Sequence, residues 1–231
     1  MKNKVLAIIT ARGGSKRIPH KNIKEFCGKP IIAYSIDAAL KSEIFDEVMV
    51  STDDGEIKKI AIKYGAVVPF LRSKQTSNDY AATHEVILEV LEEYKKIGKE
   101  FDYICCIYPT APFITAKKLR ESFEKLIDMD ADTVLPVVGF SYPPQRCFII
   151  KDNIASFKWP ENRLKRSQDL EKLYHDSGQY YFMNTKRFIE TKNLIMDKTV
   201  PVIVDEMEVQ DIDNYEDWKM AELKYRMRNK S

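Results

Sequence analysis

Short apolar segments alternate along this chain with longer segments in which apolar residues recur at helical spacing. The apolar segments lie at residues 5–10, 47–52, 66–71, 103–108 and 133–138, and each is typical of a strand buried on both faces. The helical pattern covers residues 31–42, 53–65, 80–97 and 115–128. This alternation predicts an α/β fold, a three-layer Rossmann-like sandwich with a mostly parallel central sheet. Its ligand would lie beyond the carboxyl ends of the strands.

Local signals support the boundaries of these helices. Ser51 or Thr52 is placed to cap the second helix, and Thr115 is placed to cap the fourth. Pro30 falls where the first turn of a helix tolerates proline.

The alternation stops near Ser141. Residues 141–176 hold two short strand-like pieces, 147–150 and 154–157, within a long polar stretch. Because insertions of this length are usually functional, we expect residues 141–176 to leave the sheet as an active-site lid or a dimerisation arm. Residues 179–185 and 200–204 then predict further strands, with helices near 186–191 and from Tyr215, which gives one domain over residues 1–231.

Composition excludes several classes of protein. With 37 basic and 35 acidic residues the net charge is only +2, so we expect no nucleic-acid partner. The apolar stretch from Val5 to Ala11 is at the short limit for a secretion signal, lacks a small-residue cleavage site and ends in Arg12, so we expect no secretion. No run approaches the ~20 apolar residues of a membrane span. The four cysteines form no C-x-x-C pair, and two lie in an apolar segment. This pattern favours reduced, buried thiols and a cytoplasmic protein without a membrane partner.

A glycine-rich basic turn, ARGGSKR, follows the first predicted strand. Such a turn lets backbone N–H groups approach an anion, but its spacing fits neither the P-loop nor the dinucleotide-binding fingerprint. Arg12, Lys16 and Lys21 could surround a triphosphate and offset the charge on departing pyrophosphate. The alternative is a basic loop that only faces solvent.

Two carboxylates near the end of the chain suit a metal ion. Asp211 and Asp213 are separated by one residue, so on an extended segment both side chains leave the same face. That geometry fits a hard cation such as Mg²⁺. The alternative for Asp213 is the N-cap of the last helix, with Glu216 completing a capping box.

Two further stretches offer polar groups to a ligand. Arg72, Asp79 and Thr83 could line a pocket for a base or its ribose, although Asp79 and Thr83 are also ordinary helix-start residues. Asp176, Gly178 and Gln179 could contact a sugar, although the same residues suit a turn before a strand. His175 has no activated nucleophile to serve, which argues against a catalytic triad.

With these residues in view, the chain resembles the cytidylyltransferases that activate nine-carbon acidic sugars, the CMP-sialic acid synthetase family. IITARGGSKRIPHKN resembles the family signature, and VSTDDGEI, YPTAPF and DID follow in the family's order. The resemblance implies a GT-A-like nucleotidyltransferase fold. FLRS, YPPQR and WPENRLKRSQDLEKLYHDSGQYY resemble the branch that acts on pseudaminic acid, and Tyr108 stands where sialic acid synthetases usually carry a sugar-recognising glutamine.

The resemblance implies transfer of CMP from CTP to an acidic nine-carbon sugar, with Mg²⁺ as cofactor, in a homodimer. Catalysis would rest on Arg12, Lys21 and Asp211, and Asp211 or a hydroxide held by the metal would accept the proton of the attacking sugar hydroxyl. Arg163 or Arg166 would reach the sugar carboxylate across the dimer interface. The resemblance also implies contacts from Ala11, Gly13, Ser15, Lys16 and Asn22 to the nucleotide. Arg72 and Thr83 would face cytosine or its ribose, Tyr108 would contact the sugar, and Asp211 and Asp213 would bind Mg²⁺.

The sequence leaves other activities open. The same reaction could act on N-acetylneuraminic acid, legionaminic acid or a shorter 2-keto acid sugar. More distant alternatives are a nucleotidyltransferase that uses a sugar 1-phosphate and a non-catalytic nucleotide-binding module.

Overall fold

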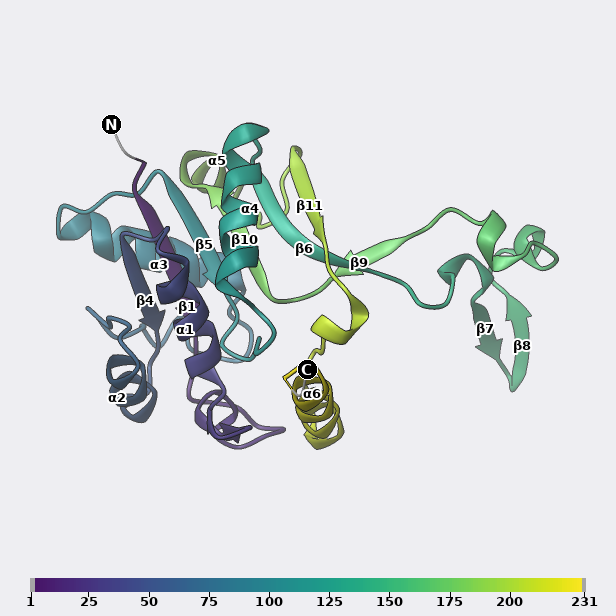
Figure 1. Ribbon diagram of the computed structural model, residues 1–231, viewed down its shortest axis with the longest axis horizontal. Helices are drawn as coiled ribbons and strands as arrows, with labels where there is room; N and C mark the ends of the chain where they lie inside the picture. The colour runs from purple at the N-terminus through teal and green to yellow at the C-terminus, as the bar shows by residue number, and fades with distance from the viewer. Residues whose placement is uncertain (1–2, 230–231) are drawn as a thin grey trace.

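A computed structural model describes residues 3–229 (Figure 1). Its centre is a seven-stranded sheet in the order β11-β6-β10-β5-β1-β4, with β9 alongside β6. The sheet strands are β1 Val5–Thr10, β4 Glu47–Ser51, β5 Tyr103–Ile107, β6 Thr133–Gly139, β9 Tyr174–Asp176, β10 Tyr180–Asn184 and β11 Thr199–Ile203. Strand β1 pairs in parallel with β4 and β5, and β6 pairs in parallel with β11, whereas β10 lies antiparallel between β5 and β6. The mostly parallel sheet is therefore confirmed, with β10 and the short β9 as its reversed members.

Helices cover both faces of the sheet. They are α1 Ile32–Ser42, α2 Gly55–Lys63, α3 Thr83–Lys96, α4 Ala116–Asp128, α5 Thr185–Thr191 and α6 Tyr215–Arg228. Leu119 of α4 shares a core with Ile9, together with residues of α1 and α2. Ile87 of α3 packs with Ile8 and with residues of α5 on the opposite face, because successive strand residues point to opposite sides. This arrangement confirms the predicted three-layer sandwich.

A third apolar cluster fixes α6 and the short hairpin formed by β2, Glu25–Phe26, and β3, Lys29–Pro30. Phe26 meets the ring of Trp218 edge to face at 5.6 Å between centroids. Ile212 is fully buried in the same cluster. The segment between Asp211 and Asp213 is thus anchored by its apolar middle residue.

Several helix boundaries differ from the sequence prediction. Asp54 caps α2, accepting hydrogen bonds from the backbone N–H groups of Glu56 and Ile57, so the predicted Ser51 or Thr52 cap is wrong. Helix α3 begins at Thr83 rather than at residue 80. The predicted Thr115 cap is confirmed.

The end of the chain corrects a second capping prediction. Asn214 caps α6, and Asp217 completes the capping box. Asp213 is therefore not the N-cap, which leaves its carboxylate available for another role.

Residues 66–71 do not form the predicted strand. Their pairing with β4 is limited to a single bridge between Met49 and Val67. Pro69 has no N–H to donate, so the ladder cannot continue through it.

Residues 140–173 extend away from the sheet as a long arm (Figure 1). Its hairpin consists of β7, Phe148–Lys151, and β8, Ile154–Phe157. The arm ends where β9 returns and pairs antiparallel with the end of β6, so residues 174–176 belong to the sheet rather than to the excursion. Among residues 3–229, no helix has both the length and the apolar character needed to cross a bilayer.

Candidate active site

The basic turn after β1 forms one wall of a cavity of about 520 Å³ at the carboxyl ends of the parallel strands. Loops from four regions of the sequence meet there, which places most of the predicted nucleotide contacts together. The cavity is lined by Thr10, Arg12, Ser15, Lys16, Arg17, Lys21, Asn22, Arg72, Asp79, Ala81, Thr83, Val86, Tyr108, Pro109, Thr110, Asp211 and Asp213. We call it the basic cavity.

Two cations of the basic turn are paired with one carboxylate. Asp79 lies 2.6 Å from Nη1 of Arg12 and 2.5 Å from Nζ of Lys16. Hydrogen bonds from Lys16 and then Arg12 lower the pKa of Asp79. Asp79 was predicted to lie beside the base or ribose. In the structure it forms ion pairs with Arg12 and Lys16, the cations that a triphosphate would need.

Lys21 ties the basic turn to the two carboxylates near the end of the chain. Its Nζ donates to the carbonyl oxygen of Ile212 at 2.7 Å, between Asp211 and Asp213. Burial lowers the pKa of Lys21, while the charges of Asp213 and Asp211 oppose that shift. Asp213 also pairs with Arg17 at 2.8 Å. The structure therefore joins segments separated by about two hundred residues of sequence into one charged wall.

Arg72 forms a fixed part of the opposite wall. Its guanidinium is buried and donates to Oγ and to the carbonyl oxygen of Ser51, at 3.0 and 2.6 Å. Burial lowers the pKa of Arg72, and the charge of Asp53 opposes that shift. Thr83 also lines the cavity, and its hydroxyl oxygen lies 3.4 Å from the hydroxyl oxygen of Tyr108.

A second cavity, of about 490 Å³, adjoins the first. Its lining includes the predicted sugar contacts Asp176 and Gly178 and, beyond them, Gly139, Phe140, His175, Glu206 and Lys224. Tyr108, Thr110 and Asp211 line both cavities. We call the second one the distal cavity, and these three shared residues form the wall between the two.

Asp176 is held firmly in the distal cavity. Its Oδ1 accepts from the backbone N–H of Gly178 at 2.8 Å, and its Oδ2 accepts from the hydroxyl of Tyr181. The ring of Tyr181 packs edge to face on Tyr108 at 5.7 Å, which connects Asp176 to the shared wall.

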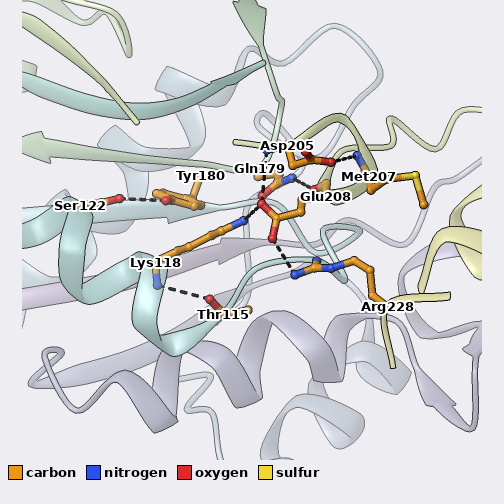
Figure 2. Close-up of polar contacts among 9 residues, drawn as sticks. All are labelled: Thr115, Lys118, Ser122, Gln179, Tyr180, Asp205, Met207, Glu208 and Arg228. Carbon is orange, nitrogen blue, oxygen red and sulfur yellow. Dashed lines mark hydrogen bonds and ion pairs between the residues drawn. The ribbon is translucent and has the colours of Figure 1, made fainter. Parts of the chain in front are cut away.

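A polar cluster around Glu208 supports the segment that leads to Asp211 (Figure 2). Glu208 pairs with Lys118 of α4 and, at 2.6 Å, with Arg228 of α6. Gln179 donates from its Nε2 to the backbone carbonyl oxygen of Glu208 at 2.6 Å, and the backbone carbonyl oxygen of Gln179 accepts from the N–H of Tyr108. The same cluster thus braces both Tyr108 and the approach to Asp211.

The comparisons with known proteins agree with this geometry. The cytidylyltransferase family profile matches residues 6–227. The chain belongs to the cytidylyltransferase family. The resemblance seen in the sequence is therefore confirmed at the level of the family.

Individual relatives of this family cover the whole chain. A pseudaminic acid cytidylyltransferase of Campylobacter jejuni subsp. jejuni serotype O:2 is 41% identical over 232 residues, covering 100% of this chain and 99% of that protein. The CMP-N,N'-diacetyllegionaminic acid synthase of Legionella pneumophila subsp. pneumophila is 34% identical over 226 residues, covering 95% of each. A solved CMP:2-keto-3-deoxy-manno-octonic acid synthetase, complexed with CTP, superposes with a TM-score of 0.68 over 99% of this chain and 100% of that one at 17% identity, which shows a shared fold.

Three residues predicted to contact ligands lie outside both cavities. Ala11 is fully buried, and its N–H donates to the carbonyl oxygen of Ser51. Gly13 donates to Asp53, and a Cβ at this position would lie 2.6 Å from Oδ2 of Asp54, so this glycine is required for packing. Gln179 is buried, and its side chain donates a hydrogen bond to the backbone of Glu208 rather than facing a cavity, which corrects its predicted sugar contact.

Arg163 and Arg166 also line neither cavity, because both lie on the arm. Arg166 pairs with Asp169 at 2.7 Å on the arm itself. Neither arginine is therefore placed at a ligand cavity within one copy of the chain.

Asn22 supports the basic turn as well as lining the cavity. Its buried side-chain amide donates to the carbonyl oxygen of Arg12 at 2.9 Å. One of the two N–H groups of the amide is therefore held by the loop backbone, which leaves the second N–H and the amide oxygen for a ligand.

Sequence reasoning missed several lining residues, including Arg17, Thr110, Glu206 and Lys224. Arg17 lies inside the basic turn, so the charge pattern could have identified it. Lys224 is one of two lysines in α6, and no local pattern distinguishes it from Lys219.

Proposed function

We propose that the chain transfers CMP from CTP to pseudaminic acid and releases pyrophosphate. The observation that carries this proposal is the shared wall: Tyr108, Thr110 and Asp211 line both the basic cavity and the distal cavity. CTP in the first and an acidic sugar in the second would bring the α-phosphorus and the sugar hydroxyl together at that wall. Such positioning supplies a large part of the rate enhancement in phosphoryl-type transfer.

The residues of the two cavities suit the individual steps. The C2 hydroxyl oxygen of the sugar attacks the α-phosphorus, and the bond from that phosphorus to the bridging oxygen of the β-phosphate breaks. Arg12, Lys16 and Lys21 stabilise the negative charge on the departing pyrophosphate. The carboxylate of Asp211, in the shared wall, accepts the hydroxyl proton.

The carboxylates present fit Mg²⁺ bound together with substrate. Among residues 3–229, no cluster of three or more His, Cys, Asp or Glu side chains could hold a metal ion alone. Mg²⁺ in nucleotidyl-transfer sites is usually held by one or two carboxylates together with substrate phosphates, and Asp211 and Asp213 supply that number. When bound, the ion would neutralise phosphate charge and make the α-phosphorus more electrophilic.

The choice of sugar is supported by two observations. The Campylobacter jejuni relative, whose name specifies pseudaminic acid, has higher identity to the chain than the Legionella pneumophila relative, whose name specifies diacetyllegionaminic acid. Tyr108 also stands in the wall of the distal cavity, in place of the glutamine expected for sialic acid. Diacetyllegionaminic acid is the second candidate, because the relative named for it covers 95% of the chain.

We further propose that the enzyme is a cytoplasmic homodimer. Phe148, Ile150, Ile154 and Leu164 leave large apolar side chains exposed on the arm, and a second copy of the chain would cover them. In that dimer Arg163 and Arg166 would close the distal cavity of the neighbouring copy. The four unpaired cysteines support a reducing compartment. Mass photometry of the purified protein should give twice the chain mass of 26.9 kDa.

The test is magnesium-dependent pyrophosphate release from CTP with a panel of nonulosonic acids. The proposal requires the highest kcat/KM with pseudaminic acid. Comparable values with pseudaminic and N-acetylneuraminic acids would contradict the assigned sugar, and no release with any member of the panel would contradict the activity.

A further inference from the structure

The distal cavity contains a strong imbalance of fixed charge. Within one copy of the chain, three carboxylates line it, from Asp176, Glu206 and Asp211, whereas Lys224 is the single lysine in the lining and no arginine of residues 3–229 lies there. The side chain of Lys172, on the arm, packs against Gly139 of the lining. An acidic sugar would bring a further carboxylate into this cavity. A desolvated carboxylate is costly unless a cation or several donors meet it.

Lys224 is fixed in place for such a contact. From α6, its Nζ donates to the carbonyl oxygen of Val209 at 2.7 Å and to that of Glu206 at 3.1 Å. An ammonium group has three protons, so these two contacts leave one uncommitted. A lysine whose end is already held loses little freedom when a ligand binds, which favours tight recognition.

We infer that Lys224 binds the carboxylate of the acidic sugar and thereby selects 2-keto sugar acids over neutral sugars. The contact would be a charge-assisted hydrogen bond from Nζ to a carboxylate oxygen. The same two carbonyl contacts place Lys224 beside the segment 209–211, so the bound carboxylate would lie close to the shared wall. This inference rests on the proposed function.

The experiment compares steady-state kinetics of Lys224→Met, Lys224→Arg and the wild type, with Lys219→Met as matched control. Lys219 lies exposed on the same helix and lines neither cavity. We expect Lys224→Met to raise the KM for the sugar roughly 10- to 100-fold, with the KM for CTP within about twofold of wild type. Lys224→Arg should recover most of the loss, and Lys219→Met should behave as wild type.

A substrate analogue separates recognition from a merely structural role of Lys224. The wild type should bind the C1 carboxamide of the sugar roughly 10- to 100-fold more weakly than the acid, measured as competitive inhibition. In Lys224→Met this preference should disappear. If the substitution weakened binding of the acid and of the amide equally, the inference would be overturned. A wild type that binds the acid and the amide equally would also overturn it, and that measurement requires no variant.

Other residues provide a rival assignment. If Arg166→Ala or Lys172→Met abolished the preference for acid over amide while Lys224→Met retained it, the inference would be overturned. A wild type that forms no CMP-sugar would instead defeat the proposed function, so the two failures are distinguishable.

Discussion

Replacing Glu208 by Gln should destabilise the protein and weaken the support of the shared wall. Glu208 pairs with Lys118 and Arg228, and the three side chains are 18%, 15% and 32% exposed, so the pairs are largely shielded from water. Hydrogen bonds to charged groups contribute about 1.5–3 kcal/mol each, and breaking a buried ion pair costs more because a charge is left unpaired. Since Gln keeps the shape and one acceptor, we expect a loss of about 3 kcal/mol, which corresponds to roughly 6–12 °C in the midpoint of thermal unfolding.

The dependence on pH gives this prediction a second observable. Burial raises the pKa of Glu208, but Lys118 and Arg228 outweigh it and the pKa is lowered overall. The stabilisation is therefore fully present above the unfolded-state pKa of about 4.3 and is lost as the pH falls through the lower folded-state value. The difference between wild type and variant should shrink over that acidic range.

Urea unfolding followed by circular dichroism at several pH values measures both effects. Glu206→Gln is the matched control, because Glu206 lies in the same turn but is exposed, and it should change stability by less than about 0.5 kcal/mol. A Glu208→Gln protein as stable as this control at pH 7, or a deficit that does not decrease in acid, would refute the reasoning.

Three further substitutions test the basic cavity. Arg12→Ala should lower kcat on the order of 10²-fold or more, because a cation facing the departing pyrophosphate is lost, and near-normal turnover would remove Arg12 from catalysis. Asp79→Asn should lower the KM for CTP a few-fold, since Asp79 competes with the triphosphate for Arg12 and Lys16, whereas a higher KM would favour the ribose contact expected from the sequence. Asp211→Asn should raise the Mg²⁺ concentration needed for half-maximal rate and lower kcat, and an unchanged magnesium titration would contradict its place as a ligand.

Much of the fold could be predicted because its signals are local. The apolar run from Val5 to Thr10 and the helical spacing after Thr115 depend only on neighbouring residues, and both elements occur where the pattern places them. Residues 66–71 failed because their apolar character was real but Pro69 limits pairing to one bridge. Whether an apolar segment finds a partner strand is decided by the rest of the chain.

The charged residues of the site could be predicted from the sequence, but the side chains with which they pair could not. Asp211 and the basic turn were identified from residue type and spacing, and the structure brings them together. The pairing of Asp79 with Arg12 and Lys16 joins two loops that the sequence does not relate. The buried position of Gln179 likewise depends on tertiary packing against the turn at Glu208, so a polar residue in a turn-like sequence was taken for a ligand contact.

The central claim is that the sugar hydroxyl attacks the α-phosphorus of CTP at the wall shared by the two cavities. The most direct measurement uses pseudaminic acid labelled with ¹⁸O at C2, CTP and Mg²⁺, followed by ³¹P NMR and mass spectrometry of the products. The account predicts one CMP-sugar for each pyrophosphate, with the ¹⁸O label retained in the oxygen atom that bridges C2 and phosphorus. A CMP-sugar without the label, formed while the unreacted sugar still carries it, would contradict attack by that hydroxyl. Pyrophosphate release without any CMP-sugar would contradict transfer to the sugar.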